Sequence, residues 1–90
     1  MSQANPIPDT AVLLVSCPDR RGIVAALAQL LYGHGANILD ADQHSDPTGM
    51  FFQRIRFDLA DMHTDRVTLQ NAITEVAQRF EMHWCLRYAA

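Results

Sequence analysis

The stretch of sequence that decides the fold is AVLLVSCPDRRGIVAALAQLLYGHGANI, residues 11–38. Residues 11–17 are almost entirely apolar, which is typical of a central strand covered on both faces or nearly so. Pro18 cannot donate a hydrogen bond to a neighbouring strand, so we expect the strand to end there. From Ile23 the period becomes helical, because large apolar residues recur at positions 23, 27, 30 and 31. Gly35 suits the left-handed position that follows a helix.

The rest of the chain predicts three more strands and one more helix. The strands are expected over residues 36–45, 50–59 and 82–88, and the helix over about 65–79. Thr64 or Asp65 is the expected N-cap, and DPTG at positions 46 to 49 has the residues of a type I turn. The order βαββαβ is that of the ferredoxin-like α+β fold, a four-stranded antiparallel sheet with two helices on one face.

Alternation along the strands predicts which side chains face the helices and which face outward. The expected apolar set of the second half is Leu69, Ile73, Val76 and Phe80 in the helix and Met82, Trp84, Leu86 and Tyr88 in the strand. On the open face, Asp42 is expected opposite Arg54 and Asp40 opposite Arg56, if one extra loop residue or a bulge adjusts the register. These charges could form a recognition surface or solvated cross-strand ion pairs, and we favour the ion pairs.

Composition indicates a single globular domain and excludes several classes of protein. The 90 residues are 49% hydrophobic and 19% charged, which is typical of a folded domain. Residues 1–10 are expected to form a flexible tail without the features of a signal peptide, and residues 11–90 the domain. No apolar run approaches the roughly 20 residues of a membrane span. The net charge is −3 and no basic stripe is visible, so we expect neither a membrane nor a nucleic acid as partner.

The cysteines and histidines do not form a pattern for catalysis or metal binding. Cys17 and Cys85 are expected to be reduced, as in a cytoplasmic protein. A catalytic Cys17 would need a histidine beside it, and the four histidines are scattered over positions 34, 44, 63 and 83. No CxxC, HxH or HxxxH spacing occurs, so we expect no metal site. Cys17 is interpreted as the inert end of a strand.

The link CPDRRG, residues 17–22, has features of a ligand-binding turn. A helix that begins after Gly22 presents free N–H groups and a positive dipole end, which suit an anion. Asp19 would suit an ammonium group, and we expect Asn37, at the start of the next strand, to lie beside the same helix end as a third contact. In the alternative, Asp19 helps to cap the helix and Asn37 is a turn residue; the residues alone favour this alternative.

Two motifs carry a resemblance to a known family. The chain from CPDRRGIVA at 17–25 to HGANI at 34–38 resembles the ACT domain, a small ligand-binding module, and the resemblance extends over about residues 10–88. With DQH at 42–44 and TGMFFQR at 48–54, the pattern is similar to the N-terminal ACT domains of the formyltetrahydrofolate deformylase family.

The resemblance implies a regulatory and not a catalytic role for these residues. Enzymes of that family hydrolyse 10-formyltetrahydrofolate to formate and tetrahydrofolate, in one-carbon metabolism and purine biosynthesis. Their catalytic residues lie in a C-terminal formyltransferase-like domain, which would begin just after Ala90. The resemblance therefore implies no catalytic residue in this chain, and we expect neither a cofactor nor a metal.

The resemblance also implies an amino-acid effector and a homodimer. ACT domains pair side by side into one extended sheet and bind small amino acids near the first strand–helix loop; glycine or methionine is the implied effector here. The corresponding residues are Asp19, Arg20, Arg21, Gly22, Ile23, Asn37 and Ile38. Two alternatives remain, a stand-alone ACT regulator resembling glycine-cleavage repressors and a purely structural dimerisation domain.

Overall fold

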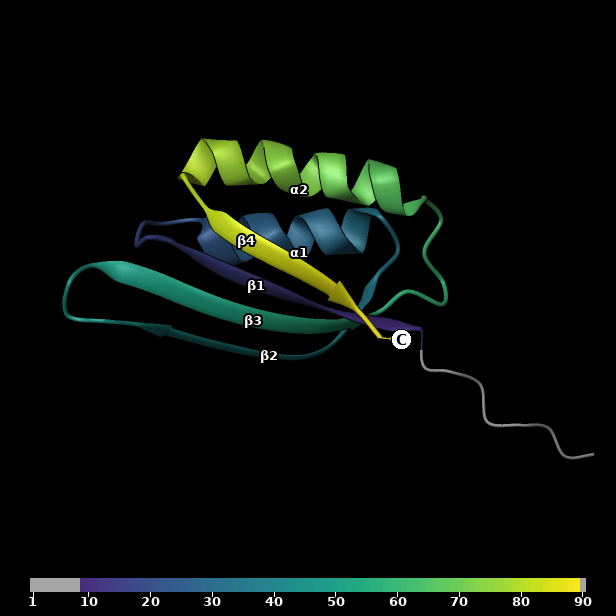
Figure 1. Cartoon of the computed structure of the whole chain (residues 1–90), viewed down its shortest axis with the longest axis horizontal. Coiled ribbons are helices and arrows are strands. Elements are labelled where there is room, and N and C mark those ends of the chain that lie inside the picture. Colours follow the sequence, from purple (N-terminus) through teal and green to yellow (C-terminus); the bar gives the residue numbers. More distant parts are fainter. Residues whose placement is uncertain (1–8, 90) are drawn as a thin grey trace, which may run out of the picture.

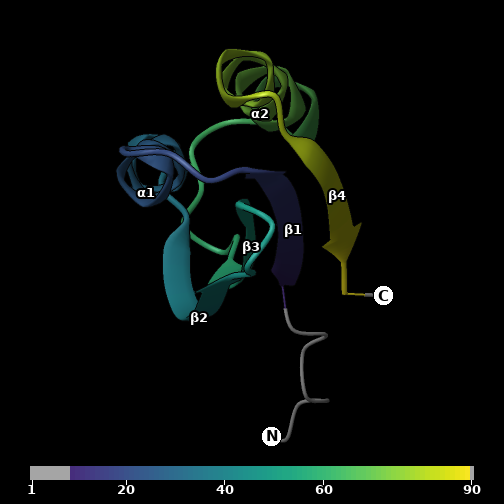
Figure 2. The same cartoon turned by 90° about the vertical axis from the view of Figure 1, so that its left-hand side faces the viewer.

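The computed structural model describes residues 9–89. Its elements are β1 (Thr10–Pro18), α1 (Ile23–Gly33), β2 (Asn37–Ser45), β3 (Met50–Asp58), α2 (Arg66–Phe80) and β4 (His83–Tyr88). The four strands form one antiparallel sheet in the order β2-β3-β1-β4. Both helices lie on the same face of this sheet (Figures 1 and 2). The ferredoxin-like architecture predicted from the sequence is confirmed.

The core lies between the sheet and the two helices. The predicted stripes are buried: Ile23, Leu27, Leu30 and Leu31 in α1, and Leu69, Ile73, Val76 and Phe80 in α2. Ala77 of α2, which the prediction did not include, is buried as well. The strands contribute alternate residues from β1 and β3, with Phe57 and Leu13 among the largest fully buried side chains. Burial of such side chains supplies most of the free energy that favours folding.

Gly35 ends α1 and Asp65 caps the start of α2. Gly35 has φ +83, and a Cβ there would lie 2.8 Å from His63 Cδ2 and 2.9 Å from the Asp61 carbonyl oxygen. The N–H of the next residue, Ala36, donates to the Leu31 carbonyl at 3.0 Å, which closes the helix end. Asp65 is the N-cap of α2, and its side chain accepts from the backbone N–H of Thr68 at 2.7 Å.

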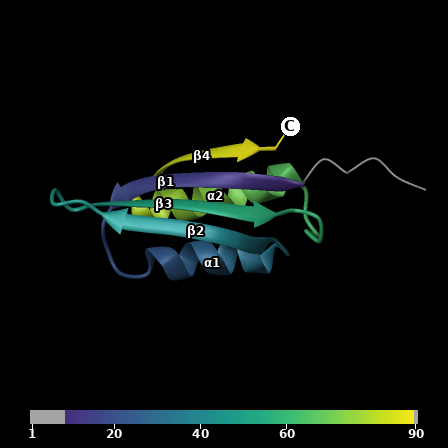
Figure 3. The same cartoon turned by 90° about the horizontal axis from the view of Figure 1, so that it is seen from below.

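β1 is the central strand that the sequence predicted, but only one of its faces is fully covered. It pairs with β3 on one side and β4 on the other, and it ends at Pro18 as expected. Leu14 is 36% exposed, because both helices lie on the opposite face (Figure 3). The expectation of cover on both faces is therefore wrong for the part of the chain that the structure describes. β1 also begins at Thr10, inside the stretch predicted to be a tail, and residues 1–8 of that tail lie outside the described residues.

The register of the β2–β3 hairpin confirms the predicted adjustment. Ser45 lies opposite Phe51, so the connection holds one residue more than a simple DPTG loop, and a further irregularity lies between Ile38 and Asp40. Asp42 is consequently opposite Arg54, and Asp40 opposite Arg56. The turn is held by Asp46, whose Oδ1 accepts from the Thr48 and Met50 backbone N–H groups.

Neither helix in the described part of the chain is long and apolar enough to cross a membrane.

Candidate functional site

The loop between β1 and α1 is tied to the tip of the β2–β3 hairpin. The backbone N–H of Asp19 donates to the Gly49 carbonyl at 2.8 Å. The hydroxyl of Ser45, the last residue of β2, donates to Asp19 Oδ2 at 2.8 Å. Asp19 itself is exposed, so its carboxylate is oriented by the hairpin while remaining open to solvent.

Gly22 leaves the start of α1 open. Gly22 is the N-cap residue with φ 94, and no side chain caps the helix. A Cβ at Gly22 would meet no atom within 4 Å, so there is free space beside the backbone. The first N–H groups of α1 have no intrahelical partner, and the first turn carries no acidic residue. The alternative in which Asp19 caps this helix is wrong, because its carboxylate binds Ser45 instead.

The two arginines and Ile23 have different surroundings. The Arg20 guanidinium lies over the Phe80 ring, 5.0 Å from its centroid, and therefore connects the loop to the end of α2. Arg21 is exposed. Ile23 is only 2% exposed and belongs to the core, so its backbone N–H, and not its side chain, is available to a ligand.

Asn37 and Ile38 do not lie beside this loop within one chain. They begin β2, where Asn37 is opposite Asp58 and Ile38 is opposite Phe57. β1 pairs its first residue, Thr10, with the same Asp58, so Asn37 lies at the end of the sheet where β1 starts. Asp19 follows the other end of β1. The expectation that Asn37 lies beside the start of α1 is wrong, because α1 runs along the sheet before β2 begins (Figure 1).

Ser45 is the site residue that the analysis of the sequence missed. In an antiparallel hairpin next to β1, the β2–β3 tip lies at the same end of the sheet as the end of β1. A hydroxyl residue directly before the DPTG turn was the available signal. Recognising it required the strand order β2-β3-β1-β4 and not the local sequence.

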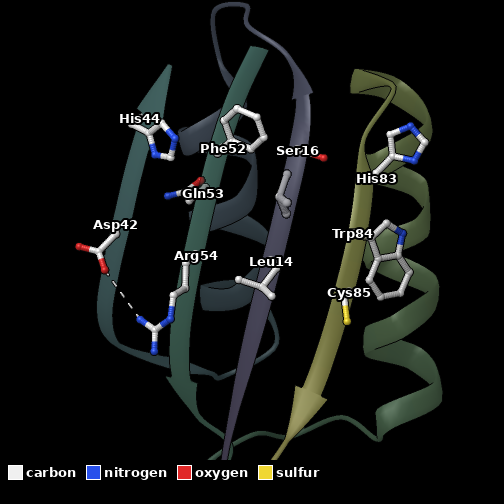
Figure 4. Close-up of a pocket in the computed structure, with 11 residues that line it drawn as sticks. Leu14, Ser16, Asp42, His44, Phe52, Gln53, Arg54, His83, Trp84 and Cys85 are labelled. Atoms are coloured by element: carbon white, nitrogen blue, oxygen red, sulfur yellow. Dashed lines mark ion pairs between the residues drawn. The ribbon is translucent and has the colours of Figure 1, made fainter. Parts of the chain in front are cut away.

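The open face of the sheet carries a shallow hollow of about 530 Å³ (Figure 4). Leu14 and Phe52 line its floor, and His44 stacks on Phe52 with ring centroids 5.1 Å apart. Arg54 forms one rim, with its Nη1 3.8 Å from Asp42 Oδ2.

The charged side chains beside this hollow form the predicted cross-strand ion pairs. Asp40 receives Arg56 Nη2 at 2.8 Å and Arg54 Nη1 at 3.0 Å. Hydrogen bonds from Arg56 and then Arg54 hold the pKa of Asp40 below its usual value. Because all three side chains are more than 40% exposed, solvent screens these pairs strongly. The interpretation as ion pairs on a solvated face is supported.

The cysteines differ in their surroundings. Cys17 is fully buried, and burial, followed by the nearby charge of Asp19, raises the pKa of its thiol. A thiol in that state is a poor nucleophile. Cys85 is exposed on β4. Within residues 9–89, no group of three or more histidine, cysteine or acidic side chains is arranged to hold a metal ion.

The βαββαβ order and two-layer packing define a ferredoxin-like module of the α+β class. The family model described as ACT domain matches residues 11–80, and the chain belongs to the ACT domain family.

Three relatives that this chain is similar to are longer proteins. Formyltetrahydrofolate deformylase of Bacillus subtilis (strain 168) is 46% identical over 84 residues, which cover 91% of this chain and 28% of that protein. Formyltetrahydrofolate deformylase of Synechocystis is 40% identical over 81 residues, with 89% and 28% covered. The crystal structure of a formyltetrahydrofolate deformylase from Pseudomonas syringae superposes with a TM-score of 0.86 at 34% identity, over 92% of this chain and 28% of that one. The chain thus spans 28% of the length of these relatives.

Proposed function

We propose that this chain is the regulatory ACT domain of a cytoplasmic formyltetrahydrofolate deformylase, which binds a small amino acid at the β1–α1 loop and pairs with a second copy. The observation that carries the proposal is the start of α1 without a side-chain cap, where the N-cap Gly22 follows the exposed Asp19 by three residues. In this proposal the hydrolysis of 10-formyltetrahydrofolate belongs to residues outside this chain.

The two charges of an α-amino acid suit the two ends of the loop. The free N–H groups and positive dipole end of α1 favour the carboxylate. Asp19 offers an acceptor to the ammonium, and Gly22 leaves space for the ligand beside the backbone. Glycine and methionine are the candidate effectors, as the resemblance to the deformylase family implies.

The exposed edge of β2 supports pairing with a second copy. All nine residues of β2 are exposed, including Ile38 at 38% and Leu39 at 40%, and Tyr32 and Val24 of the neighbouring α1 are exposed as well. Pairing of β2 with β2 would continue the sheet across the interface and cover an edge that otherwise favours non-specific association.

Such pairing would also bring Asn37 and Ile38 of one copy close to the β1–α1 loop of the other, although they lie far from that loop within one chain. Antiparallel pairing of identical strands sets the start of one strand against the end of the other. If β2 pairs about Ala41, Asn37 of the partner subunit lies beside Ser45 and hence near Asp19. The seven residues predicted from the resemblance would then form one site across the interface.

Ligand-dependent thermal unfolding tests the effector. Glycine or methionine at ten times its dissociation constant should stabilise the folded state by about 1.4 kcal/mol, which raises Tm by roughly 6–11 °C in a domain of this size. Glycinamide and N-acetylglycine are the controls, because each lacks one of the two charges. Asp19→Asn should abolish the rise while leaving the Tm of the free protein nearly unchanged, and Asp61→Asn, at another exposed position, should retain it.

The purely structural alternative rests on the same exposed β2 edge. It predicts a dimer whose Tm does not respond to either amino acid at millimolar concentration. That result would contradict effector binding and leave pairing in place.

A further inference from the structure

Ser45 lies on the helix-facing side of the sheet, at the end where β1 leads into α1. It is opposite Phe51, which in turn is opposite Cys17, and both of these side chains are buried in the core. Figure 3 shows the end of β2, the end of β1 and the start of α1 at the same end of the molecule. Ser45 itself is exposed, because β2 is an edge strand. Its hydroxyl therefore lies beside the β1–α1 loop and is open to a ligand.

Gln43, two residues before Ser45 in β2, has a different partner. Its Oε1 accepts from Nε2 of Gln53 at 3.3 Å, and Gln53 lies directly opposite on β3. Gln53 is only 6% exposed, so this bond directs Gln43 toward the core. Gln43 is thus engaged with β3, whereas the Ser45 hydroxyl is engaged with Asp19 of the β1–α1 loop.

The bond between Ser45 and Asp19 leaves acceptors on both residues. The Ser45 hydroxyl donates to Asp19 Oδ2 at 2.8 Å. A hydroxyl has one donor and two acceptor lone pairs, and an ionised carboxylate has acceptors on both oxygens. Because the proton of the Ser45 hydroxyl is directed at Asp19, Ser45 meets a ligand as an acceptor. The loop and the hairpin together therefore offer one charged and one neutral acceptor side by side.

We propose that Ser45 is a specificity-determining contact of the effector site: its hydroxyl orients Asp19 and accepts one N–H of the ligand's ammonium, while Asp19 accepts another. The inference deepens the proposed function and rests on it. Two N–H groups of one nitrogen point in different directions, so one reaches Ser45 Oγ and the other reaches Asp19 Oδ1, the oxygen that Ser45 leaves free.

The number of N–H donors on the ligand's nitrogen then determines its affinity. A primary ammonium has three donors and a singly methylated one has two, so both can satisfy Ser45 and Asp19 together. A doubly methylated ammonium has one donor and can satisfy only one of them. The site should therefore discriminate between the singly and the doubly methylated amino acid, and the Ser45 hydroxyl should be the cause.

Calorimetric titration of the whole 90-residue chain tests the contact. Glycine and N-methylglycine are compared with N,N-dimethylglycine, and L-methionine with its N-methyl and N,N-dimethyl forms. Ser45→Thr and Ser45→Val introduce side chains of nearly the same shape that both suit a strand, but only threonine keeps the hydroxyl. Relative to Ser45→Thr, Ser45→Val should bind the ligands with two or three donors about tenfold more weakly or worse. It should bind the dimethylated ligands no more than about threefold more weakly.

A matched control removes a hydroxyl elsewhere. Thr74 is exposed on α2, and its hydroxyl donates to the Gln70 carbonyl of the same helix at 2.8 Å. Thr74→Val should leave the affinity for every ligand unchanged. Because Ser45 is exposed at the sheet edge, both Ser45 variants should fold with a Tm close to that of the wild type.

Each other outcome overturns the contact. Equal affinities of Ser45→Thr and Ser45→Val for glycine and methionine would remove Ser45 from the ligand and leave the effector site standing. An equal loss for all ligands, dimethylated forms included, would mean that Ser45 only orients Asp19. If the wild-type chain binds neither glycine nor methionine, the proposed function fails and the contact with it. Should Ser45→Val not fold, Ser45→Ala against the wild type gives the same comparison.

Discussion

At the scale of single residues, a few positions determine how the loops close. Gly35 has a conformation that favours glycine, and it is packed against His63 and the Asp61 carbonyl. Gly22 is different: it also has positive φ, but it faces open space. The first glycine therefore serves the fold, while the second leaves room beside the start of α1.

Substitution of glycine by alanine should separate these constraints. Gly35→Ala forces a side chain into the left-handed region and against backbone, so the free energy of unfolding should fall by at least about 1–2 kcal/mol and Tm by roughly 4–16 °C. Gly33→Ala is the control, because Gly33 is helical and its Cβ would meet nothing within 4 Å; it should be neutral or stabilise by up to about 1 kcal/mol. Denaturant titration measures both values, and equal effects of the two substitutions would contradict the geometric account.

At the scale of the elements, the edge strand β2 differs most from its neighbours. β1 is paired on both sides, and β3 is paired with β1 and β2, whereas β2 is paired only with β3. Its register nevertheless follows the sequence, because Asp40 and Asp42 must face Arg56 and Arg54 while Ile38 faces Phe57.

A lysine in β2 should disrupt the proposed pairing of two copies. Leu39→Lys places a charge at an apolar, 40% exposed position of the edge, and the proposed pairing would have to cover this charge in both copies. Multi-angle light scattering should give twice the monomer mass for the wild type and a mass near that of the monomer for the variant. Val67→Lys, at a 67% exposed apolar position of α2, should stay dimeric. A wild-type monomer at high micromolar concentration would contradict pairing through β2.

At the scale of the whole molecule, acid should unfold the domain through its paired carboxylates. The pKa is lowered for Asp40 by Arg56 and Arg54, for Asp46 by the Thr48 hydroxyl and the Met50 N–H, and for Asp65 by the Thr68 N–H. The folded-state pKa of each group lies below its unfolded-state pKa of about 3.9. Each carboxylate therefore stabilises the folded state fully at a pH above the unfolded-state pKa, and this stabilisation is lost as the pH falls through the folded-state pKa. Tm should therefore decline below pH 4.

Asp65→Asn provides the check on that sign. The variant should be less stable than the wild type at pH 7, because the charged cap at the start of α2 is lost. The difference in Tm should shrink as the pH is lowered below about 4. A difference that grows in acid would contradict the assignment.

The sequence by itself determined the order and type of every element, because periods of 2 and 3.6, Pro18 and the glycines act locally. It also predicted the hairpin register, since a one-residue slip would exchange the two faces of β2. Only the tertiary structure decided which residues share a site. It separated Asn37 from Asp19, since α1 extends along the sheet between them, and it brought Ser45 to Asp19 and directed Gln53 toward Gln43. Such contacts join residues far apart in the chain, and strand order, which no local pattern encodes, determines which of them meet.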